Sequence, residues 1–383
     1  MKGDSLKVVK FSPIYGNNIG DIHISKCIEY GLSQHKISVQ SHDILFRNIG
    51  SFTQNSGRKK MRHFISLFLQ LKTPFIFYLL KKMIFKLSGA KNKFGDLVED
   101  ADAVIFGGGN LLMSKMGSDY AYRIAKYSMQ NRDVLSIVFS CGAGPFDFDE
   151  KSLIRKIWEN VDFLSVRDFN SKLYFEKYSL KGCHVIPDPA FIISDMVSKK
   201  QPPAEKSYIG INIIMDYFSE EELKVFAEEV VKSCWKFGLG VKIINTAFPF
   251  DSEFSERFIS MLRVVDKDLH IISIDIEENV ESLTSAYQNL EYFVGCRMHS
   301  LIFALSFSVP CLGFNWDDKV KGMFQVFLDG KPESRILSKK FETKLSQQLE
   351  TIDHEIDKKR LEEVKMAVYG GFSAIAERIK NKG

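Results

Sequence analysis

An arginine and a histidine lie two residues apart in the segment Gly295-Cys296-Arg297-Met298-His299-Ser300. The apolar run Tyr292–Val294 precedes this segment and a helical pattern over Leu301–Phe307 follows it, so both side chains are expected between a strand end and a helix start. Arginine supplies a fixed charge for a carboxylate or phosphate, and histidine changes protonation near neutral pH. The pair predicts acid–base chemistry on an anionic substrate; the alternatives are a surface arginine and a histidine that caps the helix.

A second arginine, Arg167, directly follows the apolar run Phe163–Val166 and precedes Asp168. Ligands of open α/β sheets bind at the carboxyl ends of the strands, where a guanidinium can hold an anion with two parallel hydrogen bonds. The alternative is an ion pair between Arg167 and Asp168. Lys319 follows the run Pro310–Asn315 and is expected near the edge that carries Arg297; the alternative is an isolated lysine on a helix.

Three glycine-rich loops also follow apolar runs, at Tyr15–Asp21, Gly107–Asn110 and Cys141–Pro145. Glycine lets the backbone approach a ligand closely and leaves amides at a helix N-terminus. Three consecutive glycines at 107–109 exceed what a turn requires and suggest an anion or a sugar oxygen against bare backbone. The pattern is not GxGxxG and no acidic residue follows a strand about 20 residues on, so a dinucleotide site is poorly supported.

Short apolar runs alternate with longer helical patterns along the chain, which predicts an α/β fold with parallel sheets. A helix is expected from Ser219, with Glu222 completing its capping box, to a stop at Gly238. The tail from 346 to 379 is expected to be helical with a break at Gly370-Gly371. The expected strands are Leu6–Phe11, Ala103–Phe106, Val134–Ser140, Phe163–Val166, Cys183–Ile186, Tyr208–Ile213, Val241–Asn245, His270–Ile274, Tyr292–Val294 and Pro310–Asn315.

A chain of 383 residues exceeds what one hydrophobic core usually covers, so two domains are expected. The proline-containing stretch 196–207 is the expected linker. We expect an N-terminal domain over 1–200 with a helical insertion at about 50–93, and a C-terminal domain over 201–345. The six cysteines form no CxxC pair, which argues against a zinc site and fits thiols in a reducing compartment.

Composition excludes several classes of protein. The net charge of +4 is too small to imply a nucleic-acid partner. The N-terminus lacks the apolar core of a signal peptide, and there is no run of about 18 apolar residues for a spanning helix. A cytoplasmic protein is therefore expected.

One segment, Arg58–Lys93, carries ten Lys and Arg residues and no acid among many Phe, Leu and Ile. Pro74 is expected to divide it into two helices. One interpretation is a basic amphipathic pair that lies on the anionic inner membrane surface. The other is a helical insertion whose apolar face packs on its own domain.

In order and spacing, these motifs resemble the polysaccharide pyruvyl transferase family. The resemblance runs from about residue 11 to 325, and the segment 50–93 lies outside any motif of it. The first motif carries an additional asparagine, and Cys141 stands where glutamine is frequent. The matching residues are Gly16-Asn17-Asn18-Ile19-Gly20-Asp21, Gly107-Gly108-Gly109, Gly142-Ala143-Gly144-Pro145, Arg167-Asp168 with Ser171, Asp188-Pro189-Ala190-Phe191, Gly295-Cys296-Arg297-Met298-His299-Ser300, Pro310, Asn315 and Lys319.

The resemblance implies two Rossmann-like domains facing across a cleft, similar to the GT-B glycosyltransferases. The helices of 346–383 would cross back to the N-terminal domain. It also implies phosphoenolpyruvate as donor, no metal and no cofactor, and a glycan acceptor, lipid-linked or free, on which two hydroxyls form a pyruvate ketal.

For the reaction that the resemblance implies, we assign roles to some of the matching residues and their neighbours. His299 would be the general acid or base, and Asp21 would orient or deprotonate an acceptor hydroxyl, with capping of the next helix as its alternative. The residues expected to bind the donor are Arg167, Arg297, Lys319, Gly108, Gly109, Asn110 and Ser300; those expected to bind the acceptor are Asn17, Asn18 and Gly144.

Two other functions compete with this prediction. A GT-B nucleotide-sugar glycosyltransferase shares the fold and the glycine loops, but no ribose ligand stands out near Asp275 or Glu277. A non-catalytic membrane-surface scaffold would rest on Arg58–Lys93 alone, and the presence of both Arg297 and His299 argues against it.

Overall fold

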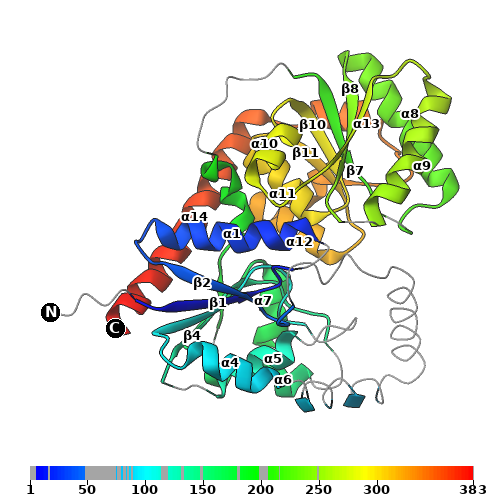
Figure 1. Ribbon diagram of the computed structural model, residues 1–383. Helices are drawn as coiled ribbons and strands as arrows, with labels where there is room; N and C mark the ends of the chain where they lie inside the picture. The colour runs from blue at the N-terminus through cyan, green and yellow to red at the C-terminus, as the bar shows by residue number, and fades with distance from the viewer. Residues whose placement is uncertain are drawn as a thin grey trace. The chain divides into compact units, whose positions relative to one another are not determined.

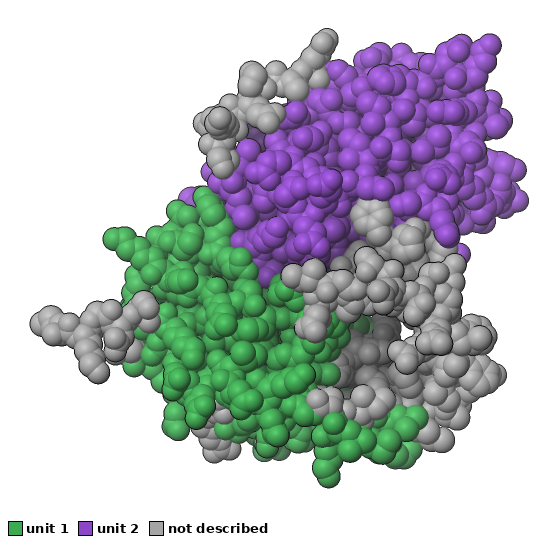
Figure 2. Space-filling view, viewed as in Figure 1, with its two compact units in different colours: residues 1–16, 28–188, 369–383 green, residues 17–27, 189–368 purple. Residues whose placement is uncertain are grey.

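The computed structural model describes residues 6–15, 18–47, 75, 79–80, 83, 86–87, 89–113, 120–130, 133–146, 150–178, 182–197, 206–214, 216–247 and 250–382. The chain divides into two compact units (Figure 2). Unit 1 comprises Met1–Gly16, Ile28–Asp188 and Tyr369–Gly383, and unit 2 comprises Asn17–Cys27 and Pro189–Val368.

This division differs from the expected boundaries in two ways. Residues 17–27 belong to unit 2 although they come early in the chain, because they start helix α1 (Ile19–Ser33) and contact unit 2 there. The expected boundary after residue 200 falls instead after Asp188, since the 3-10 helix η1 (Pro189–Met196) packs on helix α11 (Met298–Ser306) of unit 2. Most of the expected linker lies outside the described residues.

Unit 1 is built on a parallel six-stranded sheet in the order β2-β1-β3-β4-β5-β6 (Figure 1). Its core lies between the sheet and the helices and is aromatic: the rings of Phe94 and Tyr127 stack at 4.1 Å between centroids, beside Phe11 and Phe106. The elements are β1 Val8–Ser12, β2 Val39–Asp43, α4 Ala90–Val98, β3 Ala103–Gly107, α5 Tyr120–Ser128, β4 Leu135–Cys141, α6 Glu150–Asn160, β5 Phe163–Val166, α7 Phe169–Glu176 and β6 His184–Val185.

Unit 2 has a second parallel six-stranded sheet, in the order β12-β11-β10-β7-β8-β9 (Figure 1). The elements after η1 are β7 Tyr208–Asn212, α8 Glu220–Phe237, β8 Gly240–Asn245, α9 Phe250–Val265, β9 Ile271–Asp275, α10 Val280–Tyr287, β10 Leu290–Gly295, α11 Met298–Ser306, β11 Cys311–Phe314, α12 Asp318–Phe327, η2 Pro332–Arg335, β12 Ile336–Leu337, α13 Leu345–Glu350 and α14 His354–Lys382.

Helix α8 shows why local sequence rules work in unit 2. Ser219 and Glu222 form the predicted capping box, and Gly238 ends the helix in the left-handed region at φ 67°. Both ends of the predicted helix are therefore confirmed, because they depend on residues within the helix and its two caps.

The prediction of a break at Gly370-Gly371 is wrong. Helix α14 runs without interruption from His354 to Lys382. A side chain at Gly371 would place its Cβ 2.8 Å from Cγ2 of Ile186, so this glycine permits close packing in unit 1 rather than a turn.

The basic segment Arg58–Lys93, with its two predicted helices divided at Pro74, lies mostly outside the described residues. Five of its apolar residues that are described have exposed side chains: Phe75, Leu79, Leu80, Met83 and Leu87. No helix within the described ranges is long and apolar enough to cross a membrane.

Candidate functional site

Arg297 is held by a carboxylate that sequence reasoning did not identify. Its Nε atom lies 2.8 Å from Oδ2 of Asp251 and its Nη2 atom lies 2.5 Å from Oδ1, which makes a two-pronged ion pair. The Asp251 side chain is fully buried, whereas 23% of the Arg297 side chain is exposed. A buried acid thus fixes the plane of a guanidinium that still reaches solvent.

Asp251 is itself fixed by the backbone before helix α9. Its Oδ2 atom accepts hydrogen bonds from the amides of Thr246, at 3.2 Å, and Ala247, at 3.0 Å. Charge-assisted hydrogen bonds of this kind make the acid a rigid support. Because strand β8 ends at Asn245, the loop that holds Asp251 lies at the carboxyl edge of the sheet.

The backbone around Arg297 is anchored to strand β7. The amide of Arg297 donates to Oδ1 of Asn212 at 3.0 Å, and the amide of Cys296 donates to the carbonyl oxygen of the same residue at 3.0 Å. Asn212 ends β7, and its side-chain Nδ2 atom donates to the carbonyl oxygen of Ile244 on β8 at 2.8 Å. Arg297 therefore sits where the ends of β10, β7 and β8 are tied together.

His299 lies in the first turn of α11 and is 9% exposed. It packs against Gly20, near the start of helix α1: a Cβ atom added to Gly20 would lie 2.1 Å from Nδ1 of His299 and 2.5 Å from its Cγ. These distances are far below van der Waals contact, so only glycine leaves room for the imidazole in this position. The first glycine motif of the chain thus shapes the surroundings of His299.

Asn18 and Asp21 both act at the start of helix α1. Oδ1 of Asn18 accepts from the amide of Gly20 at 3.1 Å, and its Nδ2 atom donates to Oδ2 of Asp21 at 3.3 Å. The side chain that caps the helix is therefore that of Asn18, and Asp21 lies within the first turn as the hydrogen-bond partner of this cap. An acceptor contact by Asp21 stays a prediction, and Asn17 lies outside the described residues.

Lys319 lies in unit 2 next to the loop that carries Arg297. Its Nζ atom lies 3.1 Å from Oδ2 of Asp317 and 4.5 Å from the ring centre of Trp316. The indole of Trp316 donates to the carbonyl oxygen of Cys296 at 2.6 Å, which joins the loops after β10 and β11. The structure therefore brings Lys319 to the predicted edge, as part of an ion pair over an aromatic ring.

Ser300 is fully buried, and its hydroxyl lies 3.2 Å from the hydroxyl of Thr246 in a hydrogen bond. The structure thus gives Ser300 a supporting position beneath Arg297 rather than an exposed one. A contact between its hydroxyl and a donor would require this internal hydrogen bond to open.

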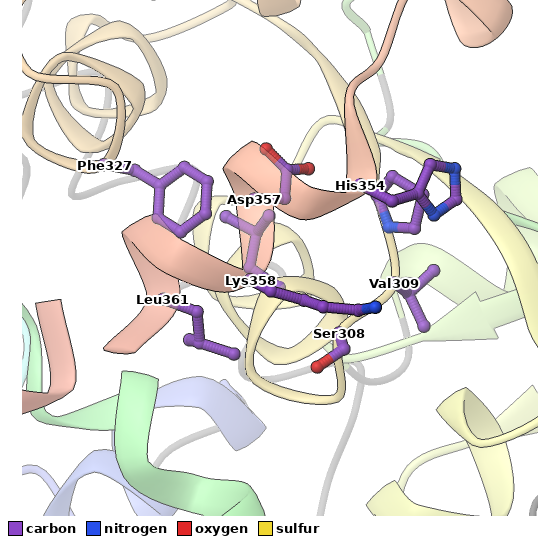
Figure 3. Close-up of a pocket in the computed structure, with 9 residues that line it drawn as sticks. Ser308, Val309, Phe327, His354, Asp357, Lys358 and Leu361 are labelled. Carbon is purple, nitrogen blue, oxygen red and sulfur yellow. The ribbon is translucent and has the colours of Figure 1, made fainter. Parts of the chain in front are cut away.

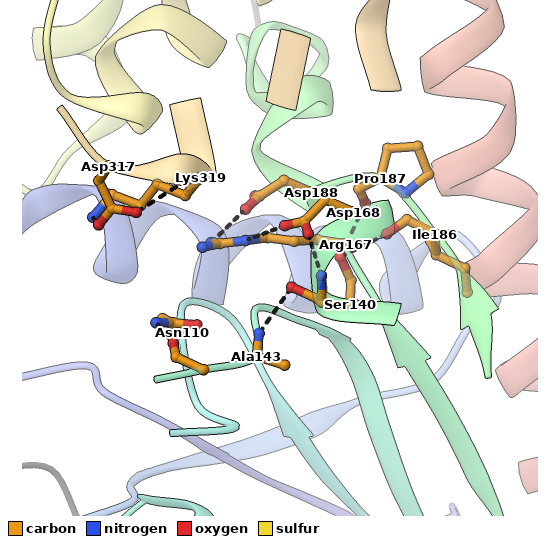
Figure 4. A network of polar contacts seen from close by, with 12 residues as sticks. Asn110, Ser140, Ala143, Arg167, Asp168, Ile186, Pro187, Asp188, Asp317 and Lys319 are labelled. Atoms are coloured by element: carbon orange, nitrogen blue, oxygen red, sulfur yellow. Dashed lines mark hydrogen bonds and ion pairs between the residues drawn. The ribbon is translucent and has the colours of Figure 1, made fainter. Parts of the chain in front are cut away.

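In unit 1, Arg167 is buried between two carboxylates (Figure 4). Its Nη1 atom lies 3.3 Å from Oδ2 of Asp188, and its Nε atom lies 3.6 Å from Oδ2 of Asp168. Only 4% of its side chain is exposed. The ion pair with Asp168 that the sequence left open as an alternative is therefore present, and Asp188 is a second partner.

Asn110 and Arg167 follow strands β3 and β5 at the carboxyl edge of the unit 1 sheet (Figure 4), and both side chains lie close to Gly142, which follows β4. A Cβ atom at Gly142 would lie 2.5 Å from Oδ1 of Asn110 and 2.6 Å from Nη2 of Arg167. Nδ2 of Asn110 also donates to the carbonyl oxygen of Gly144 at 2.9 Å. The structure thus places Asn110 and Arg167, which were assigned to the donor, near Gly144, which was assigned to the acceptor.

The glycines after β3 have a local explanation. Gly108 and Gly109 adopt φ angles of 86° and 83°, which side chains rarely tolerate. The left-handed backbone therefore gives both positions a reason to be glycine that does not depend on a ligand. Their contact with a ligand stays a prediction.

Neither thiol chemistry nor metal binding finds support in the described residues. All six cysteines are buried, and burial raises the pKa of Cys141 to about 12, so this thiol stays protonated. No group of three or more His, Cys, Asp or Glu side chains within the described ranges is placed to hold a metal ion.

A small cavity in unit 2 does not qualify as a substrate site (Figure 3). Ser308, Val309, His354 and Lys358 are among the residues that line it, and its volume is about 20 Å³. That volume holds about one water molecule.

Sequence reasoning missed Asp251, Asn212 and Thr246. Asp251 had a detectable signal, since it lies in the first turn of a helix that closely follows the strand ending at Asn245. Asn212 ends its own strand in a similar way. Nothing in the sequence shows that either residue contacts Arg297, because 46 and 85 residues separate them from it.

Comparisons with solved structures show the fold. UDP-GlcNAc 2-epimerase from Neisseria meningitidis bound to UDP-GlcNAc is 11% identical with a TM-score of 0.55, covering 99% of this chain and 100% of its own. Anabaena Alr3699/HepE in complex with UDP and glucose is 10% identical with a TM-score of 0.54, covering 98% of this chain and 99% of its own. The N-terminal domain of Candida albicans trehalose-6-phosphate phosphatase is 10% identical with a TM-score of 0.58, covering 100% of this chain and 98% of its own.

These likenesses confirm the predicted fold class of two Rossmann-like domains of the GT-B kind, and at such identities they show the fold alone. Among curated proteins, no sequence matches the chain. A model of the family described as polysaccharide pyruvyl transferase matches residues 18–318. That range includes Arg167, Arg297 and His299, and it covers well over half of the sequence. The chain belongs to the polysaccharide pyruvyl transferase family.

Proposed function

We propose that the protein transfers the enolpyruvyl unit of phosphoenolpyruvate onto two hydroxyls of a glycan sugar, forming a pyruvate ketal and releasing phosphate. The observation that carries the proposal is the position of Arg297, which a buried acid orients two residues before His299. An oriented cation beside a proton-transfer group suits a donor that carries both a carboxylate and a phosphate.

The proposed chemistry begins at the double bond of the donor. A proton adds to the methylene carbon, and one sugar hydroxyl bonds to the adjacent carbon and loses its own proton. A second hydroxyl then bonds to the same carbon while the carbon–oxygen bond to phosphate breaks and phosphate takes up the second proton. We assign proton transfer to His299, which contributes about 10²–10⁴-fold in rate as a general acid or base.

The other donor and acceptor assignments stay part of the proposal. Arg297 holds an anionic group of the donor, and Lys319 balances the charge of the departing phosphate. Arg167 forms ion pairs with two carboxylates, so it is not an isolated cation. We propose that it contacts the donor as one member of this polar cluster. Gly108, Gly109, Asn110 and Ser300 remain proposed donor contacts; Asn17, Asn18, Asp21 and Gly144 remain proposed acceptor contacts.

A nucleotide-sugar glycosyltransferase is the competing function. It would have the same fold, and two of the similar structures contain UDP or a UDP-sugar. At 10–11% identity those structures carry no information on the donor of this chain. The family match favours a pyruvyl donor over a nucleotide sugar.

Thermal unfolding in the presence of each donor tests the proposal. Without added metal, saturating phosphoenolpyruvate should stabilise the protein by about 1–3 kcal/mol, and UDP-GlcNAc should not. Arg297→Met should abolish the shift, whereas Arg263→Gln, an exposed arginine on helix α9, should keep it. If UDP-GlcNAc stabilises the protein and phosphoenolpyruvate does not, this proposal is wrong and the protein is better described as a nucleotide-sugar glycosyltransferase.

We also propose that the enzyme works at the inner membrane surface, on an acceptor that is lipid-linked. The support is the acid-free segment Arg58–Lys93, together with five exposed apolar side chains, of which 36–76% is accessible: Phe75, Leu79, Leu80, Met83 and Leu87. All of these except Leu80 lie four residues apart. Four positions at a spacing of four residues suit one face of a helix, and bulky apolar side chains among lysines suit an anionic lipid surface.

A further inference from the structure

Unit 1 contains a cavity of about 440 Å³ beside the carboxyl ends of strands β1 and β2. Small-molecule sites have volumes of about 300–1,000 Å³ and occur at strand ends of α/β sheets. We propose that this cavity binds a neutral saccharide. None of its lining residues is among those assigned above to the donor or the acceptor.

The cavity is organised by one buried acid, Asp43, the last residue of β2. Its Oδ2 atom accepts from the amide of Tyr15 at 3.1 Å, and its Oδ1 atom accepts from the amide of Leu45 at 2.9 Å. The guanidinium of Arg47 donates to both carboxylate oxygens, at 3.0 Å from Nε and 2.7 Å from Nη2. The loops after β1 and β2 are thereby fixed to each other, so the wall of the cavity is preformed.

The charges that line the cavity balance. Asp43 and Arg47 form an ion pair, and helix α4 adds Lys93 and Asp96 from its exposed side. A cavity with two acids and two bases does not favour a strongly anionic ligand such as phosphoenolpyruvate. A ligand without net charge suits it better.

Apolar and aromatic groups alternate with these polar ones. Tyr15, Phe46 and Leu97 line the cavity next to His42. Burial lowers the pKa of His42, which keeps the imidazole neutral at pH 7, and its Nε2 atom is buried without a hydrogen-bond partner among the described residues. A neutral imidazole can donate or accept, as a hydroxyl also can.

A saccharide matches this lining because a sugar ring has apolar C–H faces and a rim of hydroxyls. Aromatic side chains cover the faces, while carboxylates, guanidinium groups and imidazole bind the rim. The match of the chain to a polysaccharide-modifying family adds weight to this class of ligand. That the bound sugar is part of the acceptor rests on the proposed function; that the cavity binds a sugar does not.

The test measures saccharide binding and donor binding separately. The probes are the methyl glycosides of glucose, galactose, mannose, N-acetylglucosamine and N-acetylmannosamine, observed by saturation-transfer NMR without phosphoenolpyruvate. Asp96→Trp places a bulky ring at the cavity and His42→Leu removes its imidazole; Glu99→Trp, an exposed residue one turn further along the chain, is the matched control. Each variant is also heated with and without phosphoenolpyruvate.

At least one glycoside should bind the wild-type protein, and its signal should fall about tenfold in Asp96→Trp and in His42→Leu but not in Glu99→Trp. If phosphoenolpyruvate is the donor, it should still raise the melting temperature of all three variants. If it raises the melting temperature of neither the wild-type protein nor any variant, the proposed function is contradicted, but the saccharide result is unaffected. Three outcomes overturn the inference: no glycoside binds, binding survives both cavity variants, or folded cavity variants lose the donor shift that the wild-type protein shows.

Discussion

Replacing Gly20 by alanine should impair catalysis far more than folding. The new Cβ atom would lie 2.1 Å from Nδ1 of His299 and 2.7 Å from its Cβ. Ordinary contacts between such atoms are about 3.5–4 Å, so the imidazole must move by more than about 1 Å. A displacement of that size at a reacting group costs about 10²-fold in rate.

The cost in stability is smaller because two effects oppose each other. Overpacking of a buried site costs about 1–3 kcal/mol, whereas replacing glycine by alanine inside a helix stabilises by about 0.5–1 kcal/mol. A net loss of about 0–2.5 kcal/mol follows. Gly370→Ala on helix α14 is the control, since a Cβ atom there meets nothing within 4 Å, and it should slightly raise the melting temperature with unchanged turnover.

The assay is phosphate release from phosphoenolpyruvate with a glycan acceptor, combined with thermal unfolding of the same preparations. The expected result is a kcat about 10²-fold lower for Gly20→Ala in a protein that is still folded. Full turnover in folded Gly20→Ala would show that the position of His299 does not matter, and the proposed role of this histidine would be refuted.

Four further predictions follow from the same contacts. His299→Ala should lower kcat by about 10²–10⁴-fold in a folded protein. Unchanged turnover in steady-state kinetics would show that His299 is not catalytic and would favour the helix-capping role. Asp251→Asn should lower kcat/KM for phosphoenolpyruvate by about 10–100-fold, or about 1.4–2.7 kcal/mol, because Arg297 loses its orienting charge; equal kinetics would deny Asp251 a positioning role. Burial lowers the pKa of the fully buried His23 below 6.5, so the unfolded chain binds more protons than the folded protein at acidic pH. The free energy of unfolding should therefore fall as the pH is lowered from about 7 to about 5. His23→Gln should flatten this dependence in thermal unfolding, and an unaltered slope would contradict the prediction. In liposome co-sedimentation, wild-type protein should bind anionic vesicles at low salt and release them at high salt, and binding should weaken when serine replaces Lys59, Lys60, Arg62, Lys81 and Lys82; wild-type protein that ignores such vesicles at low salt would rule out the membrane interaction.

The sheets were largely predictable because most of their strands are continuous apolar runs. Strand β5 occupies Phe163–Val166 as predicted, and β3 and β4 differ from their predictions by single residues at their ends. Strand β2 escaped prediction because its sequence, VQSHD, is polar and it lies at the edge of the sheet. Strand β12 has only two residues, too few for any periodicity.

The candidate site was predictable only as a set of positions on strand ends. Sequence reasoning located Arg297, His299 and Arg167, since motif and strand end coincide at each. It could not find the partners that orient them, because Asp251 approaches Arg297 and Gly20 approaches His299 only after folding. The close approach of Gly20 to His299 gives this one residue of the first glycine motif a packing role, beside the acceptor contacts proposed for its neighbours.

Phosphoenolpyruvate that carries carbon-13 in its three-carbon unit shows whether this protein transfers a pyruvyl group to a glycan. The purified enzyme is incubated with the labelled donor, UDP-GlcNAc and candidate glycans. The products are analysed by mass spectrometry while phosphate release is followed. The expected product is a glycan that gains one labelled pyruvate less one water, with one phosphate released per transfer. A glycan that instead gains a sugar unit from UDP-GlcNAc, and no label from phosphoenolpyruvate, would contradict it.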